Sequence, residues 1–548
     1  MPQMTGGKAV VESLKREGVE VVFAVPGVQI MHIFDALYGE PGIRLITARH
    51  EQTTVYMADG YARVKGKPGV ALVVPGPGVQ NASAALGTAY ACSSPVLLIA
   101  GQVESYNLGQ NKGALHEIND QLDIVRPVTK WCQRVMAVPE IPAAIHEAMR
   151  QMETGRPRPT EVEIPWDIMG TKTEVALILR EKHPRPKPDP EKVRRAANLL
   201  VSAKKPFIWA GGGVILGDAS PEMVELAEAL GAAVATTPEG KGAMAEDHPL
   251  ALGGGYYGFG AARWAMPQAD VILAVGTRFS EVMRPFTALK PHQKLIHVDA
   301  DPLVIGKSYP AEIAIIAHTK AALKALVEEV RKKKSLVTAR EPWPQVELMD
   351  FRERHRIWLR EKAPLQTAII NTLRKELSDD AILVAGVTNI GYWCHLAYQA
   401  KRPRTYLTSS YFATLGYSFP TALGAKVAAP DKQVVSVVGD GGFMYALAEL
   451  ATAVRYGINL ITVVFTDNAF GSTKSDQQVN FQGRIFGTEL NNPDFARLAE
   501  LFGAKGLKAE PEHLGKALAE ALAAKKPTVI EVPIPTLIPP FQILPRPD

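Results

Sequence analysis

Residues 434–470 read VVSVVGDGGFMYALAELATAVRYGINLITVVFTDNAF, and this stretch decides the fold. A short apolar run ends at Gly439, and a helical pattern follows at once. A second apolar run, INLITVVFT, ends just before Asp467 and Asn468. Buried parallel strands have such continuous apolar runs, and the helix between them supplies the crossover connection. The stretch therefore predicts a strand–helix–strand unit of a parallel sheet.

The same alternation of short apolar runs and helical patterns extends along almost the whole chain. Further predicted strands lie in VEVVFAVPG, GVALVVPGPG, PVLLIAG, KPFIWAGGG, DVILAVGTR and AILVAG. We therefore expect an α/β fold with doubly wound parallel sheets. Two linkers are predicted, the proline-rich residues 182–190 and the charged residues 331–346. They divide the chain into three domains, at 1–180, 190–330 and 350–548.

Composition narrows the function classes. The chain has 548 residues, with 61 basic and 56 acidic side chains that give a net charge of +5. This balance is too even to indicate nucleic-acid binding. No apolar stretch reaches the roughly 18 residues that a membrane span requires. Three scattered cysteines indicate neither a disulfide framework nor a thiolate metal site, so a cytoplasmic protein is expected.

The turn after the first strand of the opening stretch suits a phosphate group and a cation. It consists of three glycines around one acid: Gly439, Asp440, Gly441 and Gly442. Glycines let backbone N–H groups approach phosphate oxygens, and a helix N-terminus favours negative charge. Asp440 would repel a phosphate unless a hard cation, Mg²⁺ or Ca²⁺, lay between them. Asn468, at the end of the adjacent strand, can offer an amide oxygen to the same ion, and the main-chain carbonyl of Phe470 a third ligand.

This arrangement closely resembles the GDG-to-Asn motif of thiamine-diphosphate enzymes. In that family the motif clamps Mg²⁺ against the cofactor diphosphate. The resemblance implies Asp440 and Asn468 as side-chain ligands of the metal, and Phe470 as the main-chain ligand. The family usually has Asn-Asn where this chain has Asp467-Asn468, and the second residue is the one that matches the ligand.

A second resemblance lies near the N-terminus, in residues 49–52, RHEQ, and in ADGYARVKGKPGVALVVPGPG after them. The run resembles the acetolactate synthase, pyruvate oxidase and benzoylformate decarboxylase group. It implies that Glu51 hydrogen-bonds the cofactor aminopyrimidine and starts the chemistry. Other residues match the family's cofactor-contacting positions, the middle pair only loosely: Gly76 and Asn81, Thr388 and Asn389, and Thr414 and Leu415.

The resemblance covers nearly the full chain and implies a pyrimidine-binding, a middle and a diphosphate-binding domain. In the family, thiamine diphosphate lies between the first domain of one subunit and the third domain of another. A homodimer is then the minimum active unit, and a homotetramer is common. The implied substrate is a small 2-oxo acid.

Acetolactate synthase is the nearest family in overall pattern, but several positions depart from it. Leu115-His116-Glu117 replaces a Phe-Gln pair before a glutamate, Val282 stands where the family has arginine, and Asp476 where it has tryptophan. An imidazole at His116 can protonate an intermediate or polarise a carbonyl, so His116 is a second catalytic candidate beside its alternative role as a structural histidine. Leucine at Leu415 is compatible with decarboxylases, whereas acetolactate synthases typically have methionine.

Three functions follow as hypotheses. The first is an acetolactate-synthase-like carboligase that decarboxylates pyruvate and transfers the two-carbon unit. The second is a non-oxidative 2-oxo acid decarboxylase or a 2-hydroxyacyl-CoA lyase. The third is a catalytically silent regulatory homologue, against which the intact Glu51, Asp440 and Asn468 argue.

The middle domain adds an open question about a second cofactor. A glycine run, residues 211–213, follows the predicted strand PFIWA. Relatives bind FAD here, and others bind ADP or an acyl-CoA. A tight strand-to-helix turn is the alternative explanation of the glycines.

Overall fold

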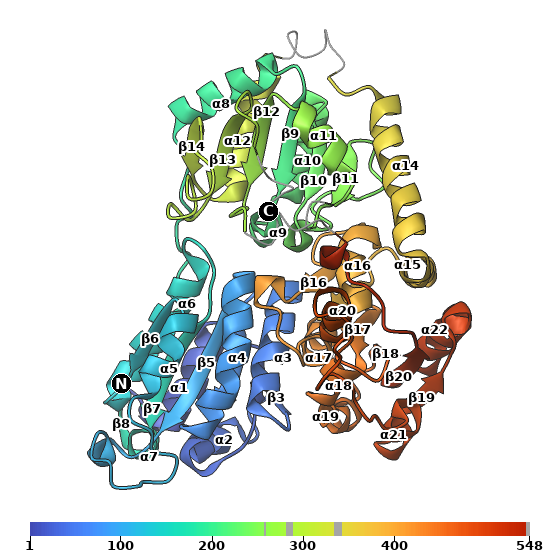
Figure 1. Ribbon diagram of the computed structural model, residues 1–548. Helices are drawn as coiled ribbons and strands as arrows, with labels where there is room; N and C mark the ends of the chain where they lie inside the picture. The colour runs from blue at the N-terminus through green and yellow to red at the C-terminus, as the bar shows by residue number, and fades with distance from the viewer. Residues whose placement is uncertain (257–258, 281–288, 334–341, 544–548) are drawn as a thin grey trace.

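The computed structural model describes residues 1–256, 259–280, 289–333 and 342–543. Within these ranges lie three sheets of six parallel strands each, flanked by helices (Figure 1). The first domain (blue to teal) and the third (orange to red) lie side by side, and the middle domain (green to yellow) lies above them. The predicted α/β class with three doubly wound domains is confirmed.

The first sheet has the strand order β3-β2-β4-β5-β7-β6. Its strands are β2 (Val21–Ala24), β3 (Arg44–Thr47), β4 (Gly69–Val73), β5 (Val96–Gln102), β6 (Trp131–Arg134) and β7 (Thr160–Pro165). The flanking helices are α1 (Gly6–Arg16), α2 (Met31–Leu37), α3 (Glu51–Lys65), α4 (Pro77–Cys92), α5 (Gln121–Val125), α6 (Ile141–Glu153) and α7 (Trp166–Gly170). A small antiparallel pair joins β1 (Gln3–Thr5) and β8 (Lys172–Glu174).

The middle sheet has the order β11-β10-β9-β12-β13-β14. Its strands are β9 (Pro206–Ala210), β10 (Ala233–Thr236), β11 (Ala251–Gly254), β12 (Val271–Val275), β13 (Lys294–Asp299) and β14 (Ile313–Ile316). The helices are α8 (Pro190–Ser202), α9 (Gly212–Leu216), α10 (Ser220–Leu230), α11 (Ala262–Ala265) and α12 (Thr319–Arg331).

The third sheet has the order β16-β15-β17-β18-β20-β19. Its strands are β15 (Ile382–Ala385), β16 (Tyr406–Thr408), β17 (Val434–Gly439), β18 (Ile461–Thr466), β19 (Lys505–Lys508) and β20 (Thr528–Pro533). The helices are α14 (Gln345–Lys362), α15 (Pro364–Glu376), α16 (Asn389–Ala397), α17 (Ser418–Ala428), α18 (Asp440–Met444), α19 (Glu449–Tyr456), α20 (Gly471–Asn480), α21 (Phe495–Leu501) and α22 (Leu514–Ala524).

The strand orders explain where sites can form. In each sheet the chain starts at an inner strand, proceeds to one edge and then returns to the other side of its start. Ligands of open α/β sheets bind at this switch point, outside the carboxyl ends of the two strands. The switch points lie between β2 and β4, β9 and β12, and β15 and β17.

Two helices hold the first and third domains together. α3 and α17 cross so closely that a Cβ atom on Gly60 would lie 2.0 Å from the Thr421 carbonyl oxygen. In the same way, a Cβ atom on Gly424 would lie 1.9 Å from the carbonyl oxygen of Met57. Real Cβ contacts are never this short, so the two helices touch through their backbones. The two domains are therefore coupled rigidly at this crossing.

The first predicted linker has no helix or strand until α8 begins at Pro190, where the side chain of Asp189 caps the helix. Part of the second predicted linker, residues 334–341, lies outside the described residues. The departure at Val282 lies outside them too. The domain boundaries therefore stay predictions. Among the described helices, none combines the length and the apolar character that a membrane crossing requires.

Candidate functional site

The predicted activating acid lies at the carboxyl edge of the first sheet. Glu51 is the first residue of α3, just after β3, and its carboxylate is half-buried. Asn81, on the first turns of α4, donates from Nδ2 to Glu51 Oε2 at 3.0 Å. The structure thus brings together two residues that the sequence places 30 positions apart. The amide holds one carboxylate oxygen, and the other, Oε1, has no hydrogen-bond partner among the described residues.

Gly76 precedes α4 and adopts a left-handed φ of 56°. A Cβ atom there would lie 2.4 Å from the carbonyl oxygen of His116, so glycine is required by both conformation and contact. The backbone of the His116 loop therefore lies against the turn that leads to Asn81. His116 itself has a left-handed φ of 68°, and its buried Nδ1 has no hydrogen-bond partner among the described residues. Its catalytic role stays a prediction.

The second group of predicted residues lies at the carboxyl ends of β17 and β18, beside the switch point of the third sheet. β17 pairs with β18 in parallel up to Gly439 and Phe465, so Asp440 and Asn468 follow neighbouring strand ends. The buried Asp440 accepts from the Gly441 amide through Oδ1, and from the Asn468 amide through Oδ2, both at 2.8 Å. Asn468 has a left-handed φ of 52°. The main-chain N–H of Asn468 therefore holds the Asp440 carboxylate, and the two residues that the sequence pairs lie next to each other.

Asn492 is a member of this group that the sequence did not reveal. Its Nδ2 donates to Asp440 Oδ2 at 2.8 Å and to Asn468 Oδ1 at 3.1 Å. It lies in the loop between α20 and α21, 52 positions after Asp440. No sequence signal distinguishes it from an ordinary turn asparagine. In the structure it orients both predicted ligands.

The chemistry of these groups fits a hard cation. Burial raises the pKa of the Asp440 carboxyl above its ordinary value, and the negative charge of Asp467 raises it further. A bound cation would offset both effects. The groups are carboxylate and amide oxygens, which Mg²⁺ prefers, and among the described residues no cluster of three His, Cys, Asp or Glu side chains competes for a metal.

Phe470 lies at the site, but its carbonyl oxygen already has partners. It accepts from the amides of Thr473 and Lys474, both at 2.9 Å, because Phe470 caps α20. A carbonyl oxygen has a second lone pair, so its role as a metal ligand stays a prediction. The Phe470 ring lies against the GDGG turn, where a Cβ atom on Gly441 would be 2.8 Å from it.

The remaining predicted cofactor residues surround the same switch point. A Cβ atom on Gly439 would lie 2.8 Å from Thr388 Oγ1, and one on Gly442 would lie 3.9 Å from Leu415 Cδ2. Thr414 Oγ1 lies 2.6 Å from Thr88 Oγ1 of α4, so this loop also touches the first domain. Asn389 is buried and donates from Nδ2 to the Leu537 carbonyl at 2.8 Å, which ties it to the C-terminal segment.

Glu449 is a second residue that sequence reasoning missed. It begins α19 in the third domain and is fully buried. Its Oε1 accepts from the amides of Arg49 at 2.9 Å and His50 at 3.2 Å, and from the Thr53 hydroxyl. The third domain thereby holds the turn that carries Glu51. In the sequence, Glu449 is an ordinary helical acid.

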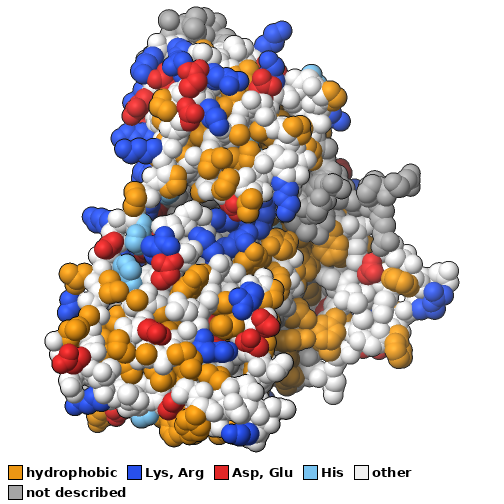
Figure 2. All heavy atoms as spheres, turned by 90° about the vertical axis from the view of Figure 1, so that its left-hand side faces the viewer, with side chains coloured by type: hydrophobic (Ala, Val, Ile, Leu, Met, Phe, Trp, Pro, Cys, Tyr) orange, Lys and Arg blue, Asp and Glu red, His pale blue; other side chains and the backbone are white. Residues whose placement is uncertain are grey.

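The glycine run of the middle domain borders a large cavity. A Cβ atom on Gly211 would lie 2.2 Å from the Gly276 carbonyl oxygen, and one on Gly213 would lie 2.6 Å from Gly276 Cα. These glycines are therefore explained by close packing at the β9–β12 switch point. The adjoining cavity of about 770 Å³ lies between the middle and first domains. Its lining has more basic than acidic side chains: the basic ones are Lys67, Arg156, Arg180, Lys182, Arg185, Arg278 and Arg404, and the acidic ones are Glu153, Glu181, Glu239 and Asp299. Figure 2 shows Lys and Arg side chains gathered along the seam between the upper and lower parts of the molecule.

Comparisons with known proteins cover all three domains. Family models of thiamine pyrophosphate enzymes match residues 4–124 (N-terminal TPP binding domain), 193–326 (central domain) and 386–532 (C-terminal TPP binding domain). A probable acetolactate synthase large subunit of Methanocaldococcus jannaschii is 34% identical over 97% of this chain and 92% of its own length. The large subunit of acetolactate synthase isozyme 3 of Escherichia coli is 33% identical over 95% and 93%. A probable 2-ketoarginine decarboxylase of Pseudomonas aeruginosa is 34% identical over 91% and 88%.

Proposed function

Because this chain belongs to the thiamine pyrophosphate enzyme family, we propose that it is an acetolactate-synthase-like carboligase. It would decarboxylate pyruvate or a similar 2-oxo acid and transfer the two-carbon unit to a second carbonyl compound. The observation that carries the proposal is the Glu51–Asn81 contact of 3.0 Å at the edge of the first sheet, where Glu51 Oε1 has no partner within the described part of the chain. Acetolactate synthases among the relatives support the choice of reaction.

When bound, thiamine diphosphate supplies a carbon nucleophile for the 2-oxo carbonyl and accepts the electron pair released with carbon dioxide. Glu51 would exchange a proton with the aminopyrimidine ring through Oε1. Asn81 would hold the other oxygen and so fix the direction of that proton.

The third domain would hold the diphosphate and Mg²⁺. Asp440 and Asn468 are the proposed side-chain ligands, and the Phe470 carbonyl is the proposed third. Asn492 would keep the first two oriented, because it donates to both. The proposed cofactor contacts are Gly76, Thr388, Asn389, Thr414, Leu415, Gly439, Gly441 and Gly442. Leu415, beside Gly442, would pack against the cofactor.

A homodimer at minimum, with a tetramer as the expected assembly, belongs to the same proposal. Large apolar side chains are exposed in a single chain near both halves of the site, such as Leu115, Phe412 and Tyr445. A partner subunit that covered them would remove apolar surface from water. Three free cysteines, two of them buried, support a reducing cytoplasm. For the middle-domain cavity we propose an anionic nucleotide, with FAD one candidate.

A second candidate function is a non-oxidative 2-oxo acid decarboxylase. It is favoured by the 2-ketoarginine decarboxylase relative and by His116, whose buried Nδ1 has no described partner. An imidazole in that place can deliver the proton that ends a decarboxylation without transfer.

The test is to incubate the purified protein with thiamine diphosphate, Mg²⁺ and pyruvate and to identify the product. We expect acetolactate. Acetaldehyde alone would overturn the carboligase in favour of the decarboxylase, and untouched pyruvate would exclude this substrate. As a matched variant, Glu51→Gln should lower the rate by about 100-fold or more while the protein still binds the cofactor.

A further inference from the structure

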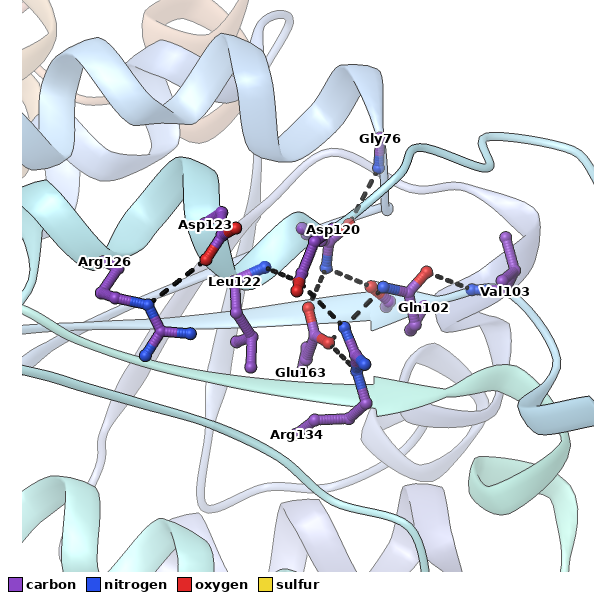
Figure 3. A network of polar contacts seen from close by, with 11 residues as sticks. Gly76, Gln102, Val103, Asp120, Leu122, Asp123, Arg126, Arg134 and Glu163 are labelled. Carbon is purple, nitrogen blue, oxygen red and sulfur yellow. Dashed lines mark hydrogen bonds and ion pairs between the residues drawn. The ribbon is translucent and has the colours of Figure 1, made fainter. Parts of the chain in front are cut away.

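The Gly76 turn is held from within the first domain by a buried amide. The Gly76 backbone N–H donates to Gln121 Oε1 at 2.9 Å. Gln121 is the first residue of the short helix α5 and is fully buried. In Figure 3, Gly76 lies at one end of a network of polar contacts that reaches Glu163 and Arg134 on the adjacent strands β7 and β6.

The orientation of the Gln121 amide is fixed by its other contacts. Nε2 donates to the Gly101 carbonyl at 3.0 Å and to Glu163 Oε2 at 2.8 Å. The other Glu163 oxygen accepts from Arg134. A flipped amide would set N–H against N–H at Gly76 and oxygen against oxygen at Gly101 and Glu163, so only one orientation satisfies all three partners.

The residue that this buried amide holds, Gly76, lies about one helical turn before Asn81. α4 begins at Pro77, directly after Gly76, and Asn81 on that helix contacts Glu51 at 3.0 Å. The His116 carbonyl blocks the other side of Gly76, because even a Cβ atom would lie 2.4 Å from it. A displacement of Gly76 would therefore be passed along the rigid helix to Asn81.

We propose that Gln121 is a positioning residue for Glu51. It fixes the Gly76 amide and, through the first turn of α4, sets Asn81 against the Glu51 carboxylate. The inference rests on the proposed function, in which Glu51 exchanges a proton with the cofactor. Gln121 itself touches neither Glu51 nor Asn81; it acts through the backbone between them.

The chain offers a matched control in Gln102. This buried amide belongs to the same network: Nε2 lies 3.5 Å from Glu163 Oε1, and Oε1 accepts from the Val103 amide at 2.8 Å. Its hydrogen bonds do not include Gly76. Gln102→Ala therefore perturbs the same buried network without releasing the turn.

The first measurement uses the full chain without cofactor. Hydrogen–deuterium exchange of a peptide spanning residues 74–81 should be about tenfold faster in Gln121→Ala, the effect of one lost hydrogen bond. It should be unchanged in Gln102→Ala. Equal exchange in wild type and Gln121→Ala would show that Gln121 does not hold the Gly76 amide. This result does not depend on which reaction the protein catalyses.

The second measurement uses the protein with thiamine diphosphate and Mg²⁺ and follows exchange of the cofactor C2 proton with D₂O. Gln121→Ala should slow this exchange by about tenfold through misplacement of Asn81 and Glu51. The exchange is measured at saturating cofactor, which separates the slowing from any change in affinity at Gly76, and Gln102→Ala should match wild type. Equal slowing in both variants would overturn the positioning role. If wild type bound the cofactor without any C2 exchange, the proposed function would be wrong. The hydrogen–deuterium exchange measurement would still show whether Gln121 holds the Gly76 amide.

Gln121→Glu keeps the test valid if the alanine variant does not fold. Its carboxyl group still accepts from Gly76, but it has no donor when ionised, and when protonated its one O–H can donate to either Gly101 or Glu163. The C2 exchange rate, relative to wild type at the same pH, should therefore rise as the pH falls from about pH 8 to about pH 6. A ratio that does not change with pH would contradict the proposal.

Discussion

Gly211 and Gly213 in the middle domain and Gly442 in the third domain lie in turns that border a switch point, but these glycines are needed for different reasons. At residues 211–213, Cβ atoms on the first and last glycine would collide with the backbone of Gly276. At Gly442, a Cβ atom would meet nothing nearer than Val438 Cγ2 at 3.4 Å, an ordinary contact. The middle turn needs glycine to pack. The GDGG turn has room at this position, so its glycine is better explained by what must bind there.

The largest effect should come from the acid of the GDGG turn. Asp440→Ala removes a proposed metal ligand and the acceptor of three hydrogen bonds. We expect the affinity for thiamine diphosphate with Mg²⁺ to fall by at least about 100-fold. Loss of a residue that only orients a metal ligand lowers the affinity by up to about 100-fold, and Asp440 is a proposed ligand itself. Isothermal titration calorimetry would measure it. Binding at wild-type strength would refute the metal assignment.

A pair of glycine variants tests the comparison directly. Gly213→Ala should destabilise the protein by about 3 kcal/mol, because backbone on both sides of the contact resists movement. Gly442→Ala should leave the free energy of unfolding unchanged or slightly higher, because alanine is the better helix former. Urea unfolding would measure both. Cofactor affinity should show the opposite pattern: it should fall in Gly442→Ala and stay unchanged in Gly213→Ala. A fall in affinity in Gly213→Ala alone would contradict our interpretation of the two turns.

Asn492→Ala should have a smaller effect on the same site. It leaves both proposed ligands in place but removes the amide that orients them. The affinity for Mg²⁺ in the presence of thiamine diphosphate should fall by about tenfold. Activity titrated against Mg²⁺ gives the measurement, with Asn491→Ala as the neighbouring control. If both variants titrated like wild type, Asn492 would be a turn residue only.

The smallest effect concerns a buried acid with no role in the site. Unlike Asp440, Glu161 on β7 is fully buried, and neither carboxylate oxygen has a hydrogen-bond partner among the described residues. Burial raises the pKa of Glu161 well above its ordinary value. The folded protein therefore holds this proton more tightly than the unfolded chain does, and stability falls as the pH rises above the unfolded pKa of 4.5 towards the folded value.

Glu161→Gln should remove this loss. We expect the variant to gain about 1 kcal/mol over wild type at neutral pH, and less in mild acid. Urea unfolding at several pH values would measure the difference. A gain that was the same at every pH would contradict the titration of Glu161.

The sequence predicted the parts of the site that follow strands. Asp440 and Asn468 could be paired in advance because parallel neighbours end at one edge, so strand order alone brings them together. Glu51 was found through its resemblance to a family, since an acid after a strand carries no signal of its own. In the structure, Asn81 lies within 3.0 Å of it.

The supporting residues could not be predicted. Asn492 reaches the site from a loop, Glu449 from a helix of another domain, and Gln121 from a short helix 45 positions after Gly76. Glu449 and Gln121 bind backbone amides, which every residue has, and Asn492 binds side chains that lie more than 20 positions away, so no local residue pattern records these contacts. Long-range hydrogen bonds of this kind appear only once the packing of the sheets is known.

The crossing of α3 and α17 limits how this protein can exchange parts with its relatives. Where helices meet through side chains, a larger residue on one can be offset by a smaller one on the other. At Gly60 and Gly424 no substitution on the other helix can make room for a side chain, because the contacting atoms belong to its main chain. We therefore expect hybrid chains, with the first domain of one relative and the third of another, to assemble only when both parents retain these two glycines. Recombination at this junction would succeed or fail outright.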